Sequence, residues 1–509
     1  GLNRVVVAAC SPRTLEPLFR DTLREAGINP YFFEFANIRE HCSWVHSREK
    51  EEATGKAKDI VRMSVARARY LEPLLEYELP VTKTALVIGG GLAGMTCTLS
   101  IAGHGYEVYL VEKESELGGT ARRIYTTLEG MDVQEFLKEI VKKVYENPLV
   151  YVYPNAEIQQ TTGYVGNFTT VVNSGRGISE IKHGATVIAT GAEVYTPTEY
   201  LYGVNEKVLT HLELEEKVAA KDENLLNADS LVMIQCVGCR NEDRNYCSRI
   251  CCSESIKNAL RLKEINPDID INILYRDMRT YGLKEDYYRE AADREIRFIR
   301  YEPENTPQVE SVSEDGREIL RITVPDVVLN KMIALDADYL ALAAAVLPSA
   351  GTEELAEMFR LTLNPDGFFK EAHVKLKPVE FSTDGMYLCG MAQYPKHITE
   401  TLSQAYGAAG RVLTLLSKDT VTASGSVCEV EESRCIGCGA CSTSCTYDAI
   451  EMRETKQGLK ASVNPILCKG DGLCNAKCPT GAISLKHYTY EELMSQIDTA
   501  CTNEMVMKT

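Results

Sequence analysis

The cysteines carry most of the chemistry in this sequence, and the most regular of them form a run near the C-terminus. Cys435, Cys438, Cys441 and Cys445 follow the spacing C-x2-C-x2-C-x3-C. This spacing lets three thiolates hold three irons of a cubane cluster, while the fourth reaches the other cluster of a pair. The glycines in the run allow the backbone to fold tightly and to direct N–H groups at the sulfides. The run therefore predicts iron–sulfur chemistry.

A second run repeats the first, with Cys468, Asp471, Cys474 and Cys478 in the same register. The two runs resemble the two-cluster domain of bacterial-type ferredoxins and fit poorly with the paired ligands of a zinc site. The resemblance assigns one 4Fe–4S cluster to Cys435, Cys438, Cys441 and Cys478, and the other to Cys468, Cys474 and Cys445. Asp471 stands where a cysteine is expected. Either its carboxylate or solvent binds the fourth iron, which we favour, or that cluster has only three irons.

Glycines at a strand-to-helix junction predict a dinucleotide site. Gly89, Gly91 and Gly94 match G-x-G-x-x-G after an apolar strand, within a βαβ unit expected over Thr84–Val111. Such glycines permit a tight turn and the close approach of a pyrophosphate at the helix N-terminus. Glu112 ends the next strand, where a carboxylate meets the ribose hydroxyls.

Two later segments, Ala185–Gly191 and Asp384–Met391, resemble the second and third motifs of flavoproteins with two dinucleotide-binding domains. Three motifs in this order favour FAD over NAD at the first site. The third motif usually ends in Gly-Asp, whereas here Met391 follows Gly390. A helix is expected over Thr399–Ala409. The resembling fold implies that its N-terminus approaches the flavin, where its positive end would favour a reduced, anionic ring. The expected FAD contacts are Gly89, Gly91, Leu92, Ala93, Gly94, Glu112, Lys113, Gly118, Gly119, Ala189, Thr190, Gly191, Gly390, Met391, His397, Ile398 and Thr399.

Cysteines also occupy the place where a nicotinamide site would be expected. In thioredoxin-reductase-like folds an inserted βαβ unit binds NAD(P)H through its own glycine fingerprint. Here the strand Ser230–Gln235 is followed by no such fingerprint. Cys236, Cys247, Cys251 and Cys252 follow instead, and they predict a further 4Fe–4S cluster near the flavin. A redox disulfide such as Cys236 with Cys239, or buried structural thiols, are the alternatives.

At this point the chain resembles the family of heterodisulfide reductase A-type subunits over nearly its whole length. The segments that carry the resemblance are Arg4–Arg13, Asn37–Trp44, the Gly89 motif, Val232–Gly238, Tyr246–Cys252, Leu274–Gly282 and Tyr394–Lys396. The resemblance implies a flavin-based electron-bifurcating subunit that is active within a complex. One electron of each pair goes to ferredoxin and the other to a higher-potential acceptor such as a heterodisulfide. The implied partners are B/C-like subunits, ferredoxin, and a hydrogenase, formate dehydrogenase or NADH-oxidising module that connects through a small iron–sulfur subunit.

The resemblance also implies roles for single residues. Lys257 would reach the flavin and stabilise its reduced form electrostatically. Cys10 and Cys42 match two cysteines of an N-terminal 4Fe–4S cluster whose other ligands would precede Gly1, so we expect the chain to be N-terminally incomplete. Family members often carry a ferredoxin insertion in the FAD domain, but residues 112–190 contain no cysteine.

The expected fold class is α/β: a thioredoxin-reductase-like flavoprotein with a small N-terminal α/β domain and a C-terminal α+β two-cluster ferredoxin domain. Helical spacing is expected over Lys56–Leu75, a helix over Val133–Tyr145 and a strand over Ile271–Tyr275. The expected divisions are an N-terminal domain (1–80), a first FAD-binding segment (81–195), an inserted NAD-domain-like region (196–339), a second FAD-binding segment (340–420), the ferredoxin domain (421–490) and a helical tail (491–509).

Composition limits the remaining function classes. The formal net charge of −18 argues against nucleic-acid binding, which requires basic patches. No apolar run approaches the roughly 18 residues of a membrane span. Oxygen-sensitive clusters imply a cytoplasmic, anaerobic setting, and we expect a dimer within a larger complex. Two alternatives remain: a subunit that relays electrons linearly, and an NAD(P)H:acceptor oxidoreductase like the small subunit of glutamate synthase.

Overall fold

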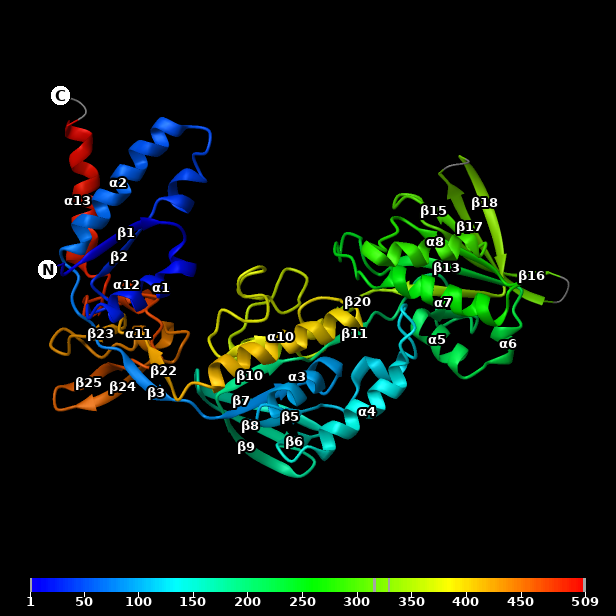
Figure 1. Ribbon diagram of the computed structural model, residues 1–509, viewed down its shortest axis with the longest axis horizontal. Helices are drawn as coiled ribbons and strands as arrows, with labels where there is room; N and C mark the ends of the chain where they lie inside the picture. Colours follow the sequence, from blue (N-terminus) through cyan, green and yellow to red (C-terminus); the bar gives the residue numbers. More distant parts are fainter. Residues whose placement is uncertain (1, 315–316, 328–329, 507–509) are drawn as a thin grey trace. The chain divides into compact units, whose positions relative to one another are not determined.

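A computed structural model of the chain describes residues 2–314, 317–327 and 330–506. These residues form two compact units. One comprises the described residues of 1–79 and 420–509, and the other comprises those of 80–419. The chain therefore passes between the units near residues 80 and 420, so its two ends belong to the same unit (Figure 1).

The unit of residues 80–419 contains a five-stranded parallel sheet in the order β21-β10-β4-β5-β6. Its strands are β4 (Thr84–Ile88), β5 (Glu107–Val111), β6 (Val150–Tyr153), β10 (Ala185–Ile188) and β21 (Met386–Leu388). Every residue of β4 and β10 is buried, as is typical of central strands covered on both faces. The predicted βαβ unit over Thr84–Val111 is thus confirmed.

Helices cover this sheet and carry the segments that line the site. Helix α3 (Leu92–Ala102) follows β4 directly and packs against α10 (Ile398–Leu416), as Figure 1 shows. Helix α4 (Val133–Glu146) also packs against α3, and Asp132 caps it by accepting a hydrogen bond from the Glu135 amide. An antiparallel sheet of β7 (Ala156–Tyr164), β8 (Asn167–Ser174) and β9 (Gly177–His183) completes this region. The predicted helices over Val133–Tyr145 and Thr399–Ala409 are confirmed, and the second is longer than predicted.

A second parallel sheet, in the order β12-β19-β13-β14-β15, is inserted between β10 and β21. Its strands are β12 (Val208–Thr210), β13 (Ser230–Val237), β14 (Asp270–Tyr275), β15 (Arg297–Arg300) and β19 (Tyr339–Ala344). The helices around it are α5 (His211–Ala219), α6 (Glu223–Leu226), α7 (Cys251–Ile265) and α8 (Glu285–Asp293). The additional strands are β16 (Gln308–Glu314), β17 (Arg317–Asp326) and β18 (Lys331–Ala337), which form an antiparallel sheet, and β11 (Ala192–Val194) and β20 (Val346–Pro348), which pair with each other. The predicted strands over Ser230–Gln235 and Ile271–Tyr275 are confirmed.

The N-terminal segment of the other unit begins with β1 (Val5–Ala9), which pairs in parallel with β2 (Phe33–Asn37). Between them runs α1 (Pro12–Glu25), and a helical turn, η1 (Arg39–Ser43), precedes α2 (Lys50–Ala68). The predicted helical spacing over Lys56–Leu75 is wrong at its C-terminal end. Helix α2 ends at Ala68, and residues 71–76 belong to no helix or strand before β3 (Tyr77–Pro80). Pro73 disfavours helical backbone at the residue before it.

The C-terminal segment of this unit holds the two cysteine runs on short elements. These are β22 (Thr420–Ala423), β23 (Cys428–Val430), α11 (Ala440–Ser444), β24 (Ile450–Thr455), β25 (Gly458–Val463), α12 (Leu473–Lys477), β26 (Ile483–Leu485) and α13 (Tyr490–Val506). Helix α13 packs against α2. Among the described residues no helix is both long and apolar enough to cross a bilayer.

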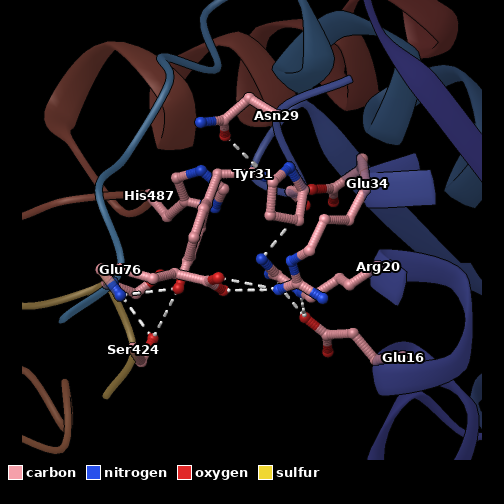
Figure 2. Close-up of polar contacts among 12 residues, drawn as sticks. Glu16, Arg20, Asn29, Tyr31, Glu34, Glu76, Ser424 and His487 are labelled. Carbon is pink, nitrogen blue, oxygen red and sulfur yellow. Dashed lines mark hydrogen bonds and ion pairs between the residues drawn. The ribbon is translucent and has the colours of Figure 1, made fainter. Parts of the chain in front are cut away.

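Polar contacts join the two ends of the chain within this unit, and Figure 2 shows those between Tyr31 and the segment at Ser424. The phenol of Tyr31 lies 3.3 Å from the hydroxyl of Ser424 and accepts a hydrogen bond of 2.6 Å from the Gly425 amide. The buried guanidinium of Arg67 pairs with Glu34 at 2.6 Å and donates to the carbonyl of His487. Residues more than 390 positions apart in sequence are therefore held side by side.

Candidate functional site

The glycine motif forms a cradle between β4 and α3. A Cβ on Gly94 would lie 1.8 Å from the Gly89 carbonyl oxygen, so only glycine allows the helix to begin this close to the strand. A Cβ on Gly91 would instead meet nothing within 4 Å. The bare backbone at Gly91 thus faces open space at the N-terminal end of α3, where a diphosphate would be held by backbone N–H groups.

Glu112 lies directly after β5 and is buried. Its Oε2 accepts a hydrogen bond of 2.6 Å from the Gly90 amide, and its Oε1 accepts one of 2.9 Å from the Glu114 amide. The amide of Gly118 donates to the Gly90 carbonyl at 2.9 Å, which places the Gly118–Gly119 turn against the cradle. Because each carboxylate oxygen can accept more than one hydrogen bond, Glu112 retains capacity for a ribose hydroxyl.

One large cavity collects most of the predicted flavin contacts. Those that line it are Gly89, Gly91, Leu92, Ala93, Glu112, Lys113, Gly118, Gly119, Ala189, Thr190, Gly191, Met391, His397, Ile398 and Thr399. Gly94 and Gly390 do not line the cavity and instead support its wall. A Cβ on Gly390 would come within 2.7 Å of the Ala93 Cβ, so glycine there allows the loop after β21 to lie against α3.

The start of α10 gives the cavity a positive edge. His397 precedes the helix, its amide donates to Glu400 at 3.1 Å, and its Nε2 is buried without a partner among the described residues. Burial, with the nearby charge of Lys284, lowers the pKa of His397. The hydroxyl of Thr190 is also buried without a partner in the described ranges. Two unpartnered polar groups and the open backbone at Gly91 fit a bound dinucleotide.

Lys396 adds a buried amine to the same wall. Its Nζ donates to the Gly390 carbonyl at 2.7 Å and to Oε1 of Gln404 at 2.6 Å, and it lies 4.0 Å from the centroid of the Tyr394 ring. Burial lowers the pKa of Lys396 to about 7. The sequence analysis includes Lys396 only as the end of the segment Tyr394–Lys396, because a lysine before a helix is more often a surface residue.

The cysteines of the inserted region come together at the end of β13 and the start of α7. Cys251 and Cys252 begin α7, and Cys236 lies near the end of β13 with a left-handed φ of 62°. Desolvation raises the pKa of Cys251, and charge on Cys252, Cys236 and Cys247 raises it further. The charges of these thiols, when ionised, therefore act on one another. Cys251 also lines the cavity that holds the glycine cradle.

Positive groups and backbone donors surround these thiols. The Arg240 guanidinium lies 3.8 Å from the Cys236 sulfur, and the Arg249 amide donates to the Cys247 sulfur at 3.3 Å. Burial, together with charge on Cys236 and Cys247, raises the pKa of Cys252 to about 11. Thiolates crowded in a low-dielectric site require compensating cations, which the irons of a cluster supply. The donor set therefore fits a cluster.

Cys239 is buried beside this group, and a hydrogen bond with Cys236 lowers its pKa. All 18 cysteines have free thiols, including the Cys236 and Cys239 pair that could have formed a disulfide. Within the described ranges no three His, Cys, Asp or Glu side chains surround the position of a single metal ion.

Lys257 is buried on α7 but does not line the cavity. Its Nζ lies 2.8 Å from Glu215 and 2.6 Å from Glu254, and of these three residues Glu254 is the one on the cavity wall. The ammonium is thus held by two carboxylates behind the wall. Direct contact between Lys257 and a flavin stays a prediction.

Three cysteines of the first C-terminal run line a pocket together with one cysteine of the second run. A pocket in this domain is lined by Cys435, Cys438, Cys441 and Cys478, together with apolar side chains such as Met452. The fourth cysteine of the second run thus joins the first three cysteines of the first run. The backbone folds tightly here, because Gly437 and Gly439 adopt left-handed φ angles of 70° and 76°. This set fits a 4Fe–4S cluster.

The second run gathers a cysteine that sequence reasoning missed. Cys428, on β23, lies with its sulfur 3.3 Å from that of Cys474, and its amide donates to the Cys468 sulfur at 3.4 Å. Hydrogen bonding from Cys428 lowers the pKa of Cys468 to about 6. Asp471 is exposed, and Cys445 accepts a hydrogen bond of 3.4 Å from the Ala449 amide. The sequence signal that could have identified Cys428 is its position seven residues before the first run.

Cys10 and Cys42 follow the carboxyl ends of β1 and β2, which are paired in parallel and therefore end at the same edge. Cys10 is half-buried, whereas Cys42 is buried and donates a hydrogen bond of 2.8 Å to the Ala53 carbonyl. Their role as cluster ligands stays a prediction.

Comparison with known proteins matches most of the chain. A family described as pyridine nucleotide-disulphide oxidoreductase matches residues 83–237, and a 4Fe-4S dicluster domain matches residues 434–482. The chain is 36% identical to the second A-type iron–sulfur subunit of the CoB–CoM heterodisulfide reductase of Methanopyrus kandleri, covering 98% of this chain and 90% of that protein. It is 35% identical to the A-type subunit of the H(2):CoB-CoM heterodisulfide,ferredoxin reductase of Methanothermobacter marburgensis, covering 100% and 90%. Thioredoxin reductase of T. acidophilum aligns over 65% of this chain and 99% of its own length, with 15% identity and a TM-score of 0.45.

Proposed function

The chain belongs to the family of heterodisulfide reductase A-type subunits, and from that premise we propose that it serves flavin-based electron bifurcation. It is an oxidoreductase subunit with a flavin-type dinucleotide domain and a 4Fe–4S dicluster domain. In the proposed reaction paired electrons enter from a donor module. One electron goes to ferredoxin and the other goes to a higher-potential acceptor such as a heterodisulfide.

The observation that carries this proposal is the position of Cys251. It lines the same cavity as Gly91 and His397, and it belongs to the group of thiols that stands where a second glycine fingerprint would bind a pyridine nucleotide. A cluster on Cys236, Cys247, Cys251 and Cys252 would therefore lie next to the bound dinucleotide. When bound, FAD would supply the exchange between paired and single electrons, which the clusters accept one at a time.

The surrounding residues would set the energetics of that exchange. The positive end of α10 favours negative charge in the cavity, and Lys396 adds a titratable amine on the same wall. Arg240 and the Arg249 amide favour electron density on the sulfurs of Cys236 and Cys247. Charge and hydrogen bonds of this kind are the means by which proteins tune cluster and flavin potentials.

We further propose four clusters beside one FAD. Two would lie in the C-terminal domain, one beside the flavin and one on Cys10 and Cys42 with ligands from elsewhere. We also propose the six domain divisions that were predicted from the sequence. The names of the relatives include hydrogen, formate and ferredoxin as reaction partners. By analogy, the proposed partners are B/C-like subunits, a hydrogenase, formate dehydrogenase or NADH-oxidising module, and ferredoxin, in an anaerobic cytoplasmic complex that contains a dimer of this chain.

A spectroelectrochemical titration of the anoxically purified, FAD-loaded chain tests the proposal. Bifurcation predicts that the flavin takes up two electrons in one unresolved step, because the flavin must accept the second electron at least as readily as the first. Two well-resolved one-electron steps would indicate a linear relay and contradict bifurcation. In a parallel sample NAD(P)H alone should leave the flavin oxidised. Rapid bleaching there would favour an NAD(P)H:acceptor oxidoreductase instead.

A further inference from the structure

Cys428 lies outside both cysteine runs in sequence but at the second run in space. It is only 4% exposed, and its sulfur is 3.3 Å from that of Cys474. Its backbone amide also donates to the sulfur of Cys468 at 3.4 Å. Three cysteine sulfurs are therefore gathered in the half of the domain where the repeat has lost one.

The fold holds Cys428 in this place from several sides. It begins β23, which pairs in antiparallel fashion with β26 so that Cys428 lies opposite Leu485. The preceding residues are anchored by Tyr31, which Figure 2 shows pointing at Ser424. A Cβ on Gly470, between Cys468 and Asp471, would lie 2.5 Å from the Ser426 carbonyl oxygen. The loop of the second run is thus packed directly against the segment that leads into Cys428.

Asp471 is directed elsewhere. Its side chain is exposed, and its Oδ1 accepts a hydrogen bond of 3.2 Å from the Leu473 amide at the start of α12. The carboxylate is therefore hydrogen-bonded to the backbone of its own loop. A thiolate is also the softer ligand, and iron–sulfur clusters are held predominantly by thiolates.

The first half of the dicluster domain has four cysteines at its proposed cluster site. There Cys435, Cys438, Cys441 and Cys478 line one pocket, with the last cysteine supplied by the opposite run. The repeat relates Cys445 to Cys478, so the second half has three cysteines from the runs and needs one more sulfur.

We propose that Cys428 replaces Asp471 as the fourth ligand of the second cluster, together with Cys468, Cys474 and Cys445. The second cluster is then a 4Fe–4S cluster with four thiolates, in place of the Asp-ligated or three-iron cluster expected from the sequence. This inference rests on the proposed function only in requiring that the dicluster domain holds two clusters.

The test compares iron and acid-labile sulfide contents and EPR spectra of anoxically reconstituted full-length variants. Cys428→Ser is expected to lower the iron content by about one to four atoms per chain, or to convert one cluster to a paramagnetic oxidised three-iron form. Asp471→Asn and the exposed-tail variant Cys501→Ser are expected to match the wild type. Because Cys428→Ser could also disturb packing, Cys428→Ser/Asp471→Cys is the decisive variant. It restores the regular run, and it should recover the wild-type iron content and EPR spectrum.

Three outcomes would overturn the inference: wild-type iron and EPR in Cys428→Ser, loss of iron in Asp471→Asn, or no recovery in the double variant. Cys435→Ser separates this failure from failure of the proposed function. If Cys435→Ser loses iron and Cys428→Ser does not, the dicluster domain is functional and only the ligand assignment is wrong. If neither variant loses iron, the proposal for the dicluster domain fails, and the assignment of Cys428 fails with it.

Discussion

The ammonium of Lys257 lies 2.8 Å from Oε2 of Glu215, and both side chains are about 95% buried. The other oxygen of Glu215 accepts hydrogen bonds from the amides of Tyr125 and Thr126, at 2.7 and 3.1 Å. The pair thus links α7, which begins with Cys251, to the loop that precedes α4. It fixes the start of α7 relative to the glycine cradle.

Removing this lysine should destabilise the chain strongly. Lys257→Met would leave the carboxylate of Glu215 buried without a counter-ion, and loss of one partner from a buried pair costs about 3–5 kcal/mol. Glu215→Gln in the same chain should recover most of that loss. Lys142→Met, which removes an exposed pair with Glu146, should change stability by less than about 0.5 kcal/mol. Thermal unfolding of the four proteins provides the comparison, and equal midpoints for the two single lysine variants would contradict this account of Lys257.

A methyl group at Gly91 should weaken FAD binding without unfolding the protein. The added Cβ meets no protein atom within 4 Å and projects into the space assigned to the diphosphate. We expect Gly91→Ala to weaken FAD binding by about tenfold or more, which corresponds to about 1.4 kcal/mol. Gly410→Ala on α10, where the Cβ also meets open space, is the matched control and should bind FAD normally. Equal FAD content in the two purified variants would place the dinucleotide elsewhere.

Acid should destabilise the FAD domain through His183. Its ring is fully buried, Nε2 lies 2.9 Å from the Thr170 hydroxyl, and burial lowers its pKa to about 4. An unfolded histidine has a pKa near 6.5. Between about pH 4 and 6.5 this histidine is therefore protonated in the unfolded chain and neutral in the folded chain. Stability should therefore fall as the pH drops from about 6.5 to 4, by up to about 3 kcal/mol from this group. The pH dependence of unfolding should be shallower in His183→Gln and unchanged in the exposed control His104→Gln. Parallel curves for wild type and His183→Gln would refute the assignment.

Two neighbouring cysteines should respond differently to the same substitution. Cys251→Ser removes a proposed ligand at the start of α7 and should lower the iron content by up to about four atoms per chain. Cys239→Ser changes a buried thiol next to Cys236 that is not a proposed ligand, and it should retain full iron. Iron analysis after anoxic reconstitution distinguishes them. Loss of iron in Cys239→Ser but not in Cys251→Ser would mean that the ligand set is misassigned.

Local sequence patterns predicted the regions of this fold whose structure is set by residues close together in the sequence. The βαβ unit around Gly89 follows from an apolar strand, a glycine turn and an apolar helix in direct succession. The pocket lined by Cys435, Cys438 and Cys441 follows from a run whose three cysteines are brought together by one tight loop. In both cases the physical cause lies within a few tens of residues, so the sequence displays it.

Features that depend on distant contacts were not predictable in the same way. Cys428 reaches Cys474 across 46 positions through the pairing of β23 with β26, and Glu215 reaches Lys257 across 42 positions. Tyr31 anchors Gly425 from the other end of the chain. Tertiary packing sets such contacts, and a substitution such as Asp471 can be interpreted only after the fold shows which sulfur lies nearby.

The most direct test of the central claim is iron-edge anomalous diffraction from crystals of the anoxically loaded, FAD-bound chain. The account predicts anomalous density among Cys236, Cys247, Cys251 and Cys252, beside a flavin held by the Gly91 cradle. A flavin in that cradle with no iron at these four sulfurs would contradict it.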